Sequence, residues 1–286
     1  MSILEVKNLS HTYSPNTPFA KEALKDINLS IDKGDFVGIV GHTGSGKSTL
    51  VQCLNGLIIP TEGDVLVDGV SLKKTKNLKD IRKRVGMVFQ YPEYQLFEET
   101  VAKDIAFGPK NLGLSSEEVK ERVEEALDRV QLSQDLKDRS PFELSGGQKR
   151  RVAIAGILAM KPHVLILDEP TAGLDPHGRD EILSEINHLY QQGDMTIFMV
   201  SHSMEEVAKL AQRMIVMNHG QVAMDGTPRE LFVQGKKLEE LSLTTPQVTK
   251  VMEELKSRGA DVATDAITLD EAYREIKNYL KEVGHA

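Results

Sequence analysis

A glycine-rich loop lies between a predicted strand and a predicted helix, and this unit constrains the fold more than any other part of the chain. The apolar stretch Phe36–Val40 predicts a buried strand, which leads directly into the sequence GHTGSGKS at residues 41–48. Residues 48–57 continue with helical patterning. Glycines let backbone N–H groups turn toward an anion, and the start of a helix adds a favourable dipole. The unit predicts a phosphate-binding loop in an α/β fold.

The side chains of this loop suit a nucleoside triphosphate and its metal ion. The Lys47 ammonium can reach the β- and γ-phosphates, and the Ser48 hydroxyl can ligate Mg²⁺. A glycine-rich turn that binds nothing is the alternative, which a full match between a strand and a helix disfavours. The predicted ATP contacts in this stretch are Gly41, Gly44, Ser45, Gly46, Lys47, Ser48 and Thr49.

Two adjacent acids follow a second apolar stretch. Residues 164–167 are apolar, and their burial would fix where Asp168 and Glu169 project. Asp168 suits Mg²⁺ coordination, as in other P-loop ATPases. Glu169 is the better candidate for polarising the attacking water. An acid pair after a strand is by itself often a helix N-cap, but beside a phosphate loop the catalytic interpretation is favoured.

The pentapeptide LSGGQ at residues 144–148 predicts a second anion site. Ser145, Gly146, Gly147 and Gln148 would begin a helix, whose N-terminus suits an anion. Two such sites imply either two nucleotides per chain or one nucleotide shared between two chains. The ordered set of phosphate loop, LSGGQ and acid pair resembles the ATP-binding-cassette (ABC) ATPases, which use the shared arrangement. The resemblance implies ATP hydrolysis, with ATP and Mg²⁺ bound.

Further residues gain a role from this resemblance, which spans about residues 3–232. Tyr13 resembles the aromatic residue that stacks on adenine, and His202 resembles the histidine that contacts the γ-phosphate. Gln90 resembles the glutamine that touches the metal and the water, and Asp175 lies in the loop that communicates between the two sites. An isolated Tyr or a strand-end His is otherwise usually structural. The resemblance thus assigns catalysis to Glu169, His202, Gln90 and Asp175, and metal binding to Ser48, Gln90 and Asp168.

The stretch after Gln90, YPEYQLFEETVAKDIAFGP at residues 91–109, resembles the energy-coupling factor (ECF) transporters, a vitamin- and metal-importing branch of the family. That branch has two ATPase types that commonly pair, and GHTG at 41–44 with EPTAGL at 169–174 resembles the second type. Lys149 departs from the Met common there after LSGGQ. The resemblance implies an importer subunit bound to a second ABC ATPase, as a heterodimer or a homodimer, and to membrane-embedded coupling and substrate-binding subunits.

The same stretch combines acidic and apolar residues in a way that predicts a docking surface. The acids are Glu93, Glu98, Glu99 and Asp104, and the apolar residues are Leu96, Phe97, Val101 and Ile105. Because Arg forms directional bonds to carboxylates, an acidic rim suits a partner helix that carries arginines. The alternative is an ordinary helix end whose apolar residues face the core.

The alternation of strands and helices predicts a P-loop NTPase core with a parallel sheet, an antiparallel N-terminal β layer, a helical subdomain and a small helical C-terminal extension. We expect residues 1–235 to form the nucleotide-binding domain, with the helical subdomain at about 91–160, and 236–286 to form the extension. Thr245 with Pro246, and Thr268 with Glu271, are predicted to start the extension's helices. Their apolar stripes either pack on the chain's own core or form a dimer contact.

Charge and cysteine usage narrow the choice of partners and compartment. The net charge of −8 over 286 residues disfavours broad nucleic-acid binding, and the basic triplets at 82–84 and 149–151 are interpreted as solvated or phosphate-proximal charges. Cys53 is the only cysteine, which favours a reducing compartment, and no stretch resembles a signal peptide or a membrane helix. We expect a peripheral protein at the cytoplasmic face of the cell membrane. Two alternatives stay open: an ATPase of another ABC importer and, less favoured, a non-transport ABC ATPase acting on ribosomes or DNA.

Overall fold

A computed structural model describes residues 2–75, 77–193 and 195–284. The chain forms two compact units, one of residues 1–35 and 48–200 and the other of residues 36–47 and 201–286. Within the described ranges, no helix is both long enough and apolar enough to cross a membrane.

The first unit contains the predicted antiparallel N-terminal layer, with strand order β2-β1-β4-β5. In this layer β1 (Ser2–Tyr13) pairs with β2 (Lys21–Asp32) on one side and with β4 (Glu62–Val67) on the other, and β5 (Val70–Ser71) pairs with β4. Alternate residues of β1, such as Leu4 and Val6, are buried. One face of the layer therefore faces the core.

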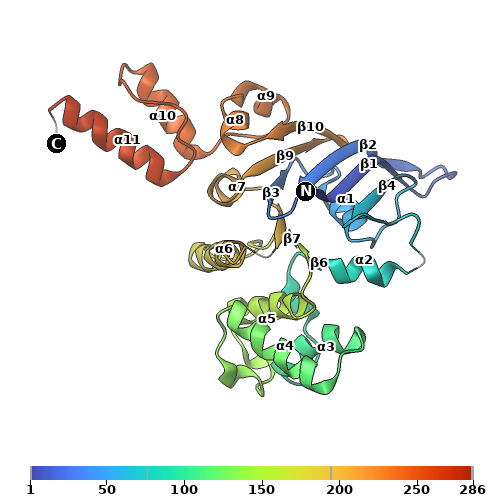
Figure 1. Ribbon diagram of the computed structural model, residues 1–286. Coiled ribbons are helices and arrows are strands. Elements are labelled where there is room, and N and C mark those ends of the chain that lie inside the picture. The colour runs from blue at the N-terminus through green and yellow to red at the C-terminus, as the bar shows by residue number, and fades with distance from the viewer. Residues whose placement is uncertain (1, 76, 194, 285–286) are drawn as a thin grey trace. The chain divides into compact units, whose positions relative to one another are not determined.

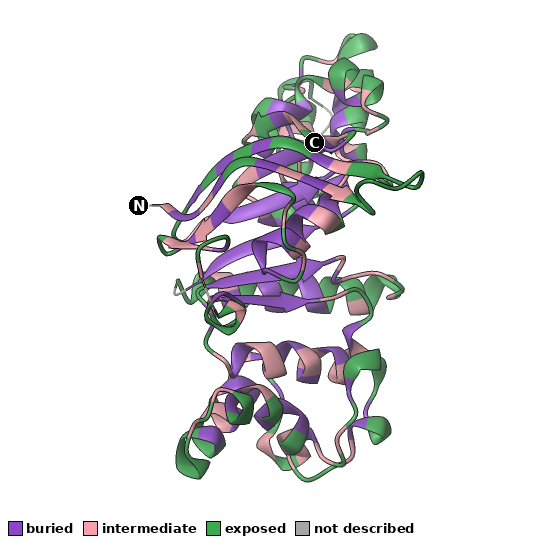
Figure 2. Cartoon of the chain, turned by 90° about the vertical axis from the view of Figure 1, so that its right-hand side faces the viewer, coloured by how far each residue is buried: buried purple, intermediate pink, exposed green. Residues whose placement is uncertain are grey.

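Three parallel strands form the buried centre of the first unit: β6 (Val85–Val88), β7 (Val164–Asp168) and β8 (Thr196–Val200). Every residue of these strands is buried (Figure 2). Parallel strands covered on both faces appear in a sequence as continuous apolar runs, which is why each could be predicted. The first unit also contains the helices α1 (Lys47–Leu54), α2 (Leu78–Arg84) and α6 (Pro176–Gln191).

The predicted helical stretch of the first unit contains α3 (Val101–Asn111), α4 (Ser116–Arg129) and α5 (Gly146–Leu158), which pack on one another (Figure 1). Three short 3₁₀ turns accompany them: η1 (Pro92–Gln95) precedes α3, and η2 (Gln134–Leu136) and η3 (Pro141–Glu143) lie between α4 and α5. Helix α4 begins with a capping box between Ser115 and Glu118 and buries Val119, Val123 and Leu127 on one face.

The second unit contains β3 (Phe36–Val40), which pairs in parallel with β9 (Arg213–Asn218), and β10 (Gln221–Gly226), which pairs with β9 in antiparallel fashion. Its helices are α7 (Met204–Leu210), α8 (Pro228–Phe232), α9 (Gly235–Glu240), α10 (Gln247–Ser257) and α11 (Leu269–Glu282). A Cβ on Gly38 of β3 would lie 2.7 Å from Val207 Cγ1. Helix α7 therefore packs closely on β3 because that position is glycine.

Helices α10 and α11 share a small core of their own. It consists of Met252, Val262, Ala266 and Ala272, with Val248, Leu255, Ala260, Ile276 and Tyr279 packed against it. The predicted capping box of Thr268 and Glu271 is confirmed, whereas Thr245 is not the N-cap of α10. Pro246 takes that position, because its extended backbone (φ −51°, ψ 147°) delays the helix to Gln247.

Candidate nucleotide site

The loop between β3 and α1 has a backbone that favours glycine. Gly41, Gly44 and Gly46 have φ angles of 151°, 83° and 104°. A Cβ on Gly41 would lie 2.3 Å from the carbonyl oxygen of Met217 and 2.6 Å from Ser45 Oγ. A side chain at position 41 would therefore displace either the loop or β9. The loop packs so closely against β9 that this position requires glycine.

The ammonium of Lys47 lies over this loop. Lys47 Nζ donates hydrogen bonds to the carbonyl oxygens of Gly41 at 2.7 Å and His42 at 3.2 Å. Lys47 is 5 % exposed, and the hydroxyl of the buried Ser45 has no hydrogen-bond partner in the described part of the chain. A phosphate offers charged acceptors to such donors, which bind an anion more strongly than a neutral carbonyl. The residues present therefore fit a triphosphate.

Two oxygen donors lie at predicted metal positions in the first unit. Ser48 is exposed in the first turn of α1, and Asp168 is 8 % exposed at the end of β7. The described residues contain no cluster of three or more His, Cys, Asp or Glu side chains that could hold a metal alone. A hydroxyl and one carboxylate suit Mg²⁺, which usually completes its shell with waters and substrate phosphates.

Glu169 follows β7 in a strained backbone conformation. Its φ is +52°, a left-handed value that is uncommon outside glycine, and its N–H donates to the carbonyl oxygen of Val200 at 3.0 Å. Gln90 Nε2 donates to Glu169 Oε2 at 3.0 Å. The structure thus brings together two predicted catalytic residues that lie far apart in the sequence.

The predicted adenine-stacking residue lies beside the first turn of α1. Tyr13 Oη and Thr49 Oγ1 are 3.1 Å apart, and the ring of His11 lies edge-on to the Tyr13 ring at 4.7 Å. Tyr13 is 40 % exposed, so part of this residue is accessible to a ligand. The structure thus brings together two residues that are predicted to contact the nucleotide.

The LSGGQ segment begins α5 with an exposed N-terminus. Ser145 Oγ accepts a hydrogen bond from the N–H of Gln148 at 3.3 Å, and Gln148 Oε1 accepts one from the N–H of Ser145 at 3.0 Å. Gly146 and Gly147 have open space where a Cβ would lie. The capping box uses one lone pair of the Ser145 hydroxyl and leaves the glycine N–H groups of the first turn accessible to an anion.

Asp175 and His202 lie at the starts of two helices. Asp175 is the N-cap of α6 and accepts a hydrogen bond from the N–H of Gly178 at 2.7 Å. His202, in the second unit, is exposed between Ser201 and Ser203 just before α7. Asp175 thus stabilises the start of α6, and its predicted role in communication between the two nucleotide sites would be additional to this capping.

The predicted acidic docking rim is only partly correct. Glu93 bonds to Arg150 of its own chain, and Glu99 pairs with Lys103. Asp104 accepts hydrogen bonds from the N–H groups of Phe97 and Glu98. These carboxylates stabilise local structure, because they already form ion pairs or hydrogen bonds with cations and backbone amides of their own chain. Of the four predicted apolar residues, Leu96, Val101 and Ile105 are buried, and only Phe97 is well exposed, at 59 %.

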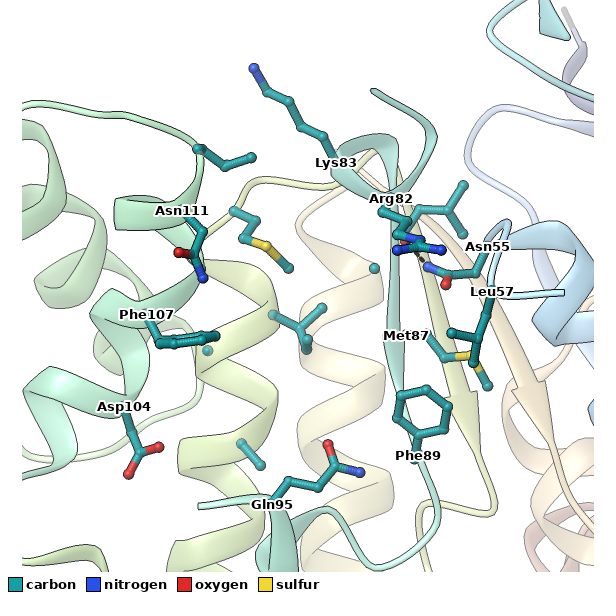
Figure 3. Close-up of a pocket in the computed structure, with 18 of the residues that line it drawn as sticks. Asn55, Leu57, Arg82, Lys83, Met87, Phe89, Gln95, Asp104, Phe107 and Asn111 are labelled. Atoms are coloured by element: carbon teal, nitrogen blue, oxygen red, sulfur yellow. Dashed lines mark hydrogen bonds between the residues drawn. The ribbon is translucent and has the colours of Figure 1, made fainter. Parts of the chain in front are cut away.

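A groove of about 660 Å³ lies between α3 and α5 on one side and α2 and β6 on the other (Figure 3). Phe107 and Asp104 come from α3, while Met87 and Phe89 come from the β6 side. Phe107 is 47 % exposed and packs edge-on against Phe97 at 5.1 Å. Its α2 wall is basic and consists of Lys79, Arg82 and Lys83. The sequence did not reveal this basic wall, because it does not show that α3 and α5 lie across the groove from the basic residues of α2.

Arg150 is a second residue that the sequence did not reveal. It was interpreted as a solvated or phosphate-proximal charge, but it is 1 % exposed and forms a bidentate ion pair with Glu93. A signal was present, because Arg150, Ile154 and Leu158 recur at a spacing of four residues and share the buried face of α5. Spacing alone places the arginine on the apolar face, where a charge requires a partner.

Burial changes the pKa of three groups outside the phosphate loop. It raises the pKa of the Asp104 carboxyl, against the lowering effect of the Phe97 and Glu98 amides. It raises the pKa of Glu185 on α6 to about 8, although Arg151 Nε lies 3.0 Å from that carboxylate. It raises the pKa of the buried Cys53 to about 12, so this thiol acts as core packing.

Comparison of the sequence with known proteins supports the resemblance to the ABC ATPases. The family model described as ABC transporter matches residues 24–172. The energy-coupling factor transporter ATP-binding protein EcfA2 of Caldanaerobacter subterraneus subsp. tengcongensis is 58 % identical over 279 residues, covering 97 % of this chain and 98 % of the relative. The protein of the same name from Clostridium perfringens is 56 % identical, covering 94 % and 95 %.

Solved structures agree with this assignment. CbiO1 of Clostridium perfringens, described as part of the ABC transporter complex cbiONQ, is 39 % identical with a TM-score of 0.75, covering 88 % of this chain and 99 % of that one. The ATP-binding cassette MJ0796, in a dimeric post-hydrolysis state bound to ADP and Pi, is 31 % identical with a TM-score of 0.69, covering 79 % and 98 %. The predicted P-loop NTPase fold is confirmed.

Proposed function

The chain belongs to the ABC transporter family, as an ATPase of the energy-coupling factor type, and we propose that it hydrolyses Mg-ATP at a site shared with a second cassette to drive import through membrane partners. The observation that carries this proposal is the 3.0 Å hydrogen bond between Gln90 and Glu169. Gln90 begins the segment that lines the groove, and Glu169 is the proposed catalytic acid after β7. This hydrogen bond therefore connects the proposed partner surface to the proposed site of hydrolysis.

Each side chain of the site takes a defined role. The phosphate loop and Lys47 hold the β- and γ-phosphates, and Tyr13 supports the adenine. Ser48, Gln90 and Asp168 would hold Mg²⁺, which would neutralise negative charge on the phosphates. Glu169 accepts a proton from the attacking water, and His202 contacts the γ-phosphate.

A second chain completes the site. Ser145, Gly146, Gly147 and Gln148 present an exposed helix N-terminus to the γ-phosphate held by the partner cassette. ATP binds the closed pair better than the open one and therefore favours closure, while hydrolysis removes that preference. Asp175, at the start of α6, communicates between the two sites. A heterodimer with a related ATPase is favoured over a homodimer.

The groove receives an α-helix of a membrane-embedded partner at the cytoplasmic face of the membrane. Phe97 and Phe107 offer exposed apolar surface to such a helix, and the basic wall of Lys79, Arg82 and Lys83 suits acidic residues on it. The arginines expected on the partner helix from the sequence stay a prediction beside this one.

The C-terminal extension, residues 236–286, provides a further contact with the second cassette. Leu269, Tyr273 and Leu280 are 74 %, 61 % and 39 % exposed on α11, although the core between α10 and α11 covers Ile276. Residues 1–235 form the nucleotide-binding domain, with the helical subdomain at about 91–160. Replacing Tyr273 and Leu280 by Asp should weaken cassette pairing in gel filtration, and unchanged pairing would remove the extension from this role.

Purification of the tagged chain from native membranes tests the proposed function. Mass spectrometry should identify a second cassette ATPase, a membrane scaffold and small substrate-binding membrane proteins. Phe107→Asp should lose the membrane partners but keep ATP binding, while Phe19→Asp, at a side chain 84 % exposed outside the groove, should keep both. Recovery of ribosomal or DNA-associated proteins without any membrane protein would contradict the transport role.

A further inference from the structure

Arg150 on α5 uses all of its guanidinium nitrogens inside the protein. Nε and Nη2 donate to the two carboxylate oxygens of Glu93, at 3.0 and 2.8 Å. Nη1 donates to the carbonyl oxygen of Pro170 at 2.8 Å, and Nη2 also donates to that of Ala172 at 3.1 Å. The side chain is 1 % exposed. The planar fork of a guanidinium is what allows one residue to hold two other segments at once, η1 and the turn at 170–172.

Two of those bonds end in the turn that carries the catalytic acid. Pro170 and Ala172 lie one and three positions after Glu169, and the N–H of Ala172 donates to the carbonyl oxygen of Glu169 at 3.1 Å. The backbone of Glu169 is in the left-handed region, at φ +52°, which persists only where surrounding contacts enforce it. Arg150 supplies two of the contacts that hold this turn.

The other two bonds end in η1. Glu93 lies three residues after Gln90, whose amide bonds to the Glu169 carboxylate. The segment that begins at Gln90 therefore reaches the catalytic turn twice, directly through Gln90 and indirectly through Glu93 and Arg150. A buried ion pair is weak support for stability, because apolar residues of similar volume often serve as well. Its geometry favours a role in specifying position.

We propose that Arg150 is a positioning residue for hydrolysis, which fixes the turn at 170–172 and thereby the carboxylate of Glu169, and that Glu93 orients the Arg150 fork. The proposal rests on the proposed function only for the reaction, ATP hydrolysis. Arg150 and Glu93 act through Glu169 and have no direct part in holding the nucleotide.

Steady-state ATP hydrolysis by the purified complex tests this role. Glu93→Gln keeps the size of the side chain but removes the charge that fixes the fork, so kcat should fall about tenfold while KM for ATP stays within about twofold. Glu93→Asp keeps the charge and should recover a large part of kcat. Glu121→Gln, the same substitution at an exposed position of α4, is the matched control and should match the wild type.

Two further measurements separate positioning from folding and from failure of the proposed function. Thermal unfolding of each variant should stay well above the assay temperature, and Arg150→Lys should repeat the kcat loss, since an ammonium cannot hold Glu93 and both carbonyls together. Unchanged kcat in Glu93→Gln, or a rise in KM that accounts for the loss, would overturn the proposal. ATP hydrolysis and thermal unfolding can be measured on a complex with any set of partners. An unexpected set of co-purified proteins would therefore contradict the proposed transport role without affecting the test of Arg150.

Discussion

Gln90 donates a hydrogen bond from its side-chain amide to the carboxylate of Glu169, with 3.0 Å between Nε2 and Oε2. The two residues are 79 positions apart, and they follow the neighbouring parallel strands β6 and β7. Parallel strands end at the same edge of a sheet, so this pairing turns two distant sequence motifs into one site. Gln95 and Phe97, shortly after Gln90, line the groove, which brings that surface within a few residues of the proposed catalytic acid.

Adding a single methyl group at Gly41 should disable the phosphate loop. Because the Cβ would lie 2.3 Å from Met217 O, Gly41→Ala must displace the loop, and ATP affinity should fall at least about tenfold by titration calorimetry. Gly34→Ala is the control, since Gly34 has a φ of +86° but no atom within 4 Å of the added Cβ. It should cost about 1 kcal/mol of stability and leave ATP affinity unchanged. Normal ATP binding by Gly41→Ala would contradict the assignment of this loop.

Removing the Tyr13 ring should weaken nucleotide binding without slowing hydrolysis. Stacking of a base on an aromatic side chain contributes about 1–3 kcal/mol, so Tyr13→Ala should raise KM for ATP about tenfold and keep kcat at saturating ATP. Tyr13→Phe keeps the ring and loses only the 3.1 Å contact with Thr49, and it should stay close to the wild type. If both variants behave alike, Tyr13 is a packing residue.

The buried Glu185 should make stability depend on pH. Its pKa is about 8 in the folded chain against an ordinary 4.5, so between these values the folded state binds more protons than the unfolded state. The free energy of unfolding therefore falls as pH rises through this range, by about 1.4 kcal/mol per unit at most from this group. Glu185→Gln removes the effect, so its stability relative to the wild type should improve from pH 5 to pH 8 in urea titrations. A pH-independent difference would show that this carboxyl does not titrate as stated.

Much of the fold follows from patterns that the sequence displays directly. The strands β6, β7 and β8 are buried along their whole length and therefore appear as apolar runs. Capping boxes at Ser115 and Thr268 could be predicted because the residues that bond lie three positions apart. Thr245 was assigned wrongly, since the extended backbone of Pro246 decides where α10 begins.

The candidate site was less accessible from sequence, because its contacts join distant segments. Gln90 and Glu169 became a pair only through family resemblance, and their 3.0 Å contact has no local signal. Arg150 was misjudged because charged residues are usually exposed, and its partner Glu93 lies 57 positions away. Asp104 was predicted to belong to the acidic docking rim, but its carboxylate accepts hydrogen bonds from two backbone N–H groups of its own segment. No rule of sequence spacing predicts these two hydrogen bonds.

The central claim is that two cassettes share each ATP and that Glu169 drives its hydrolysis. The most direct measurement is the mass distribution of Glu169→Gln and wild-type complexes with Mg-ATP and with Mg-ADP, recorded beside ATP turnover. The claim predicts that Glu169→Gln loses turnover by at least about a hundredfold, as general base removal does, and accumulates a closed cassette pair in Mg-ATP but not in Mg-ADP. Turnover near that of the wild type, or pairing that ignores the nucleotide, would contradict it.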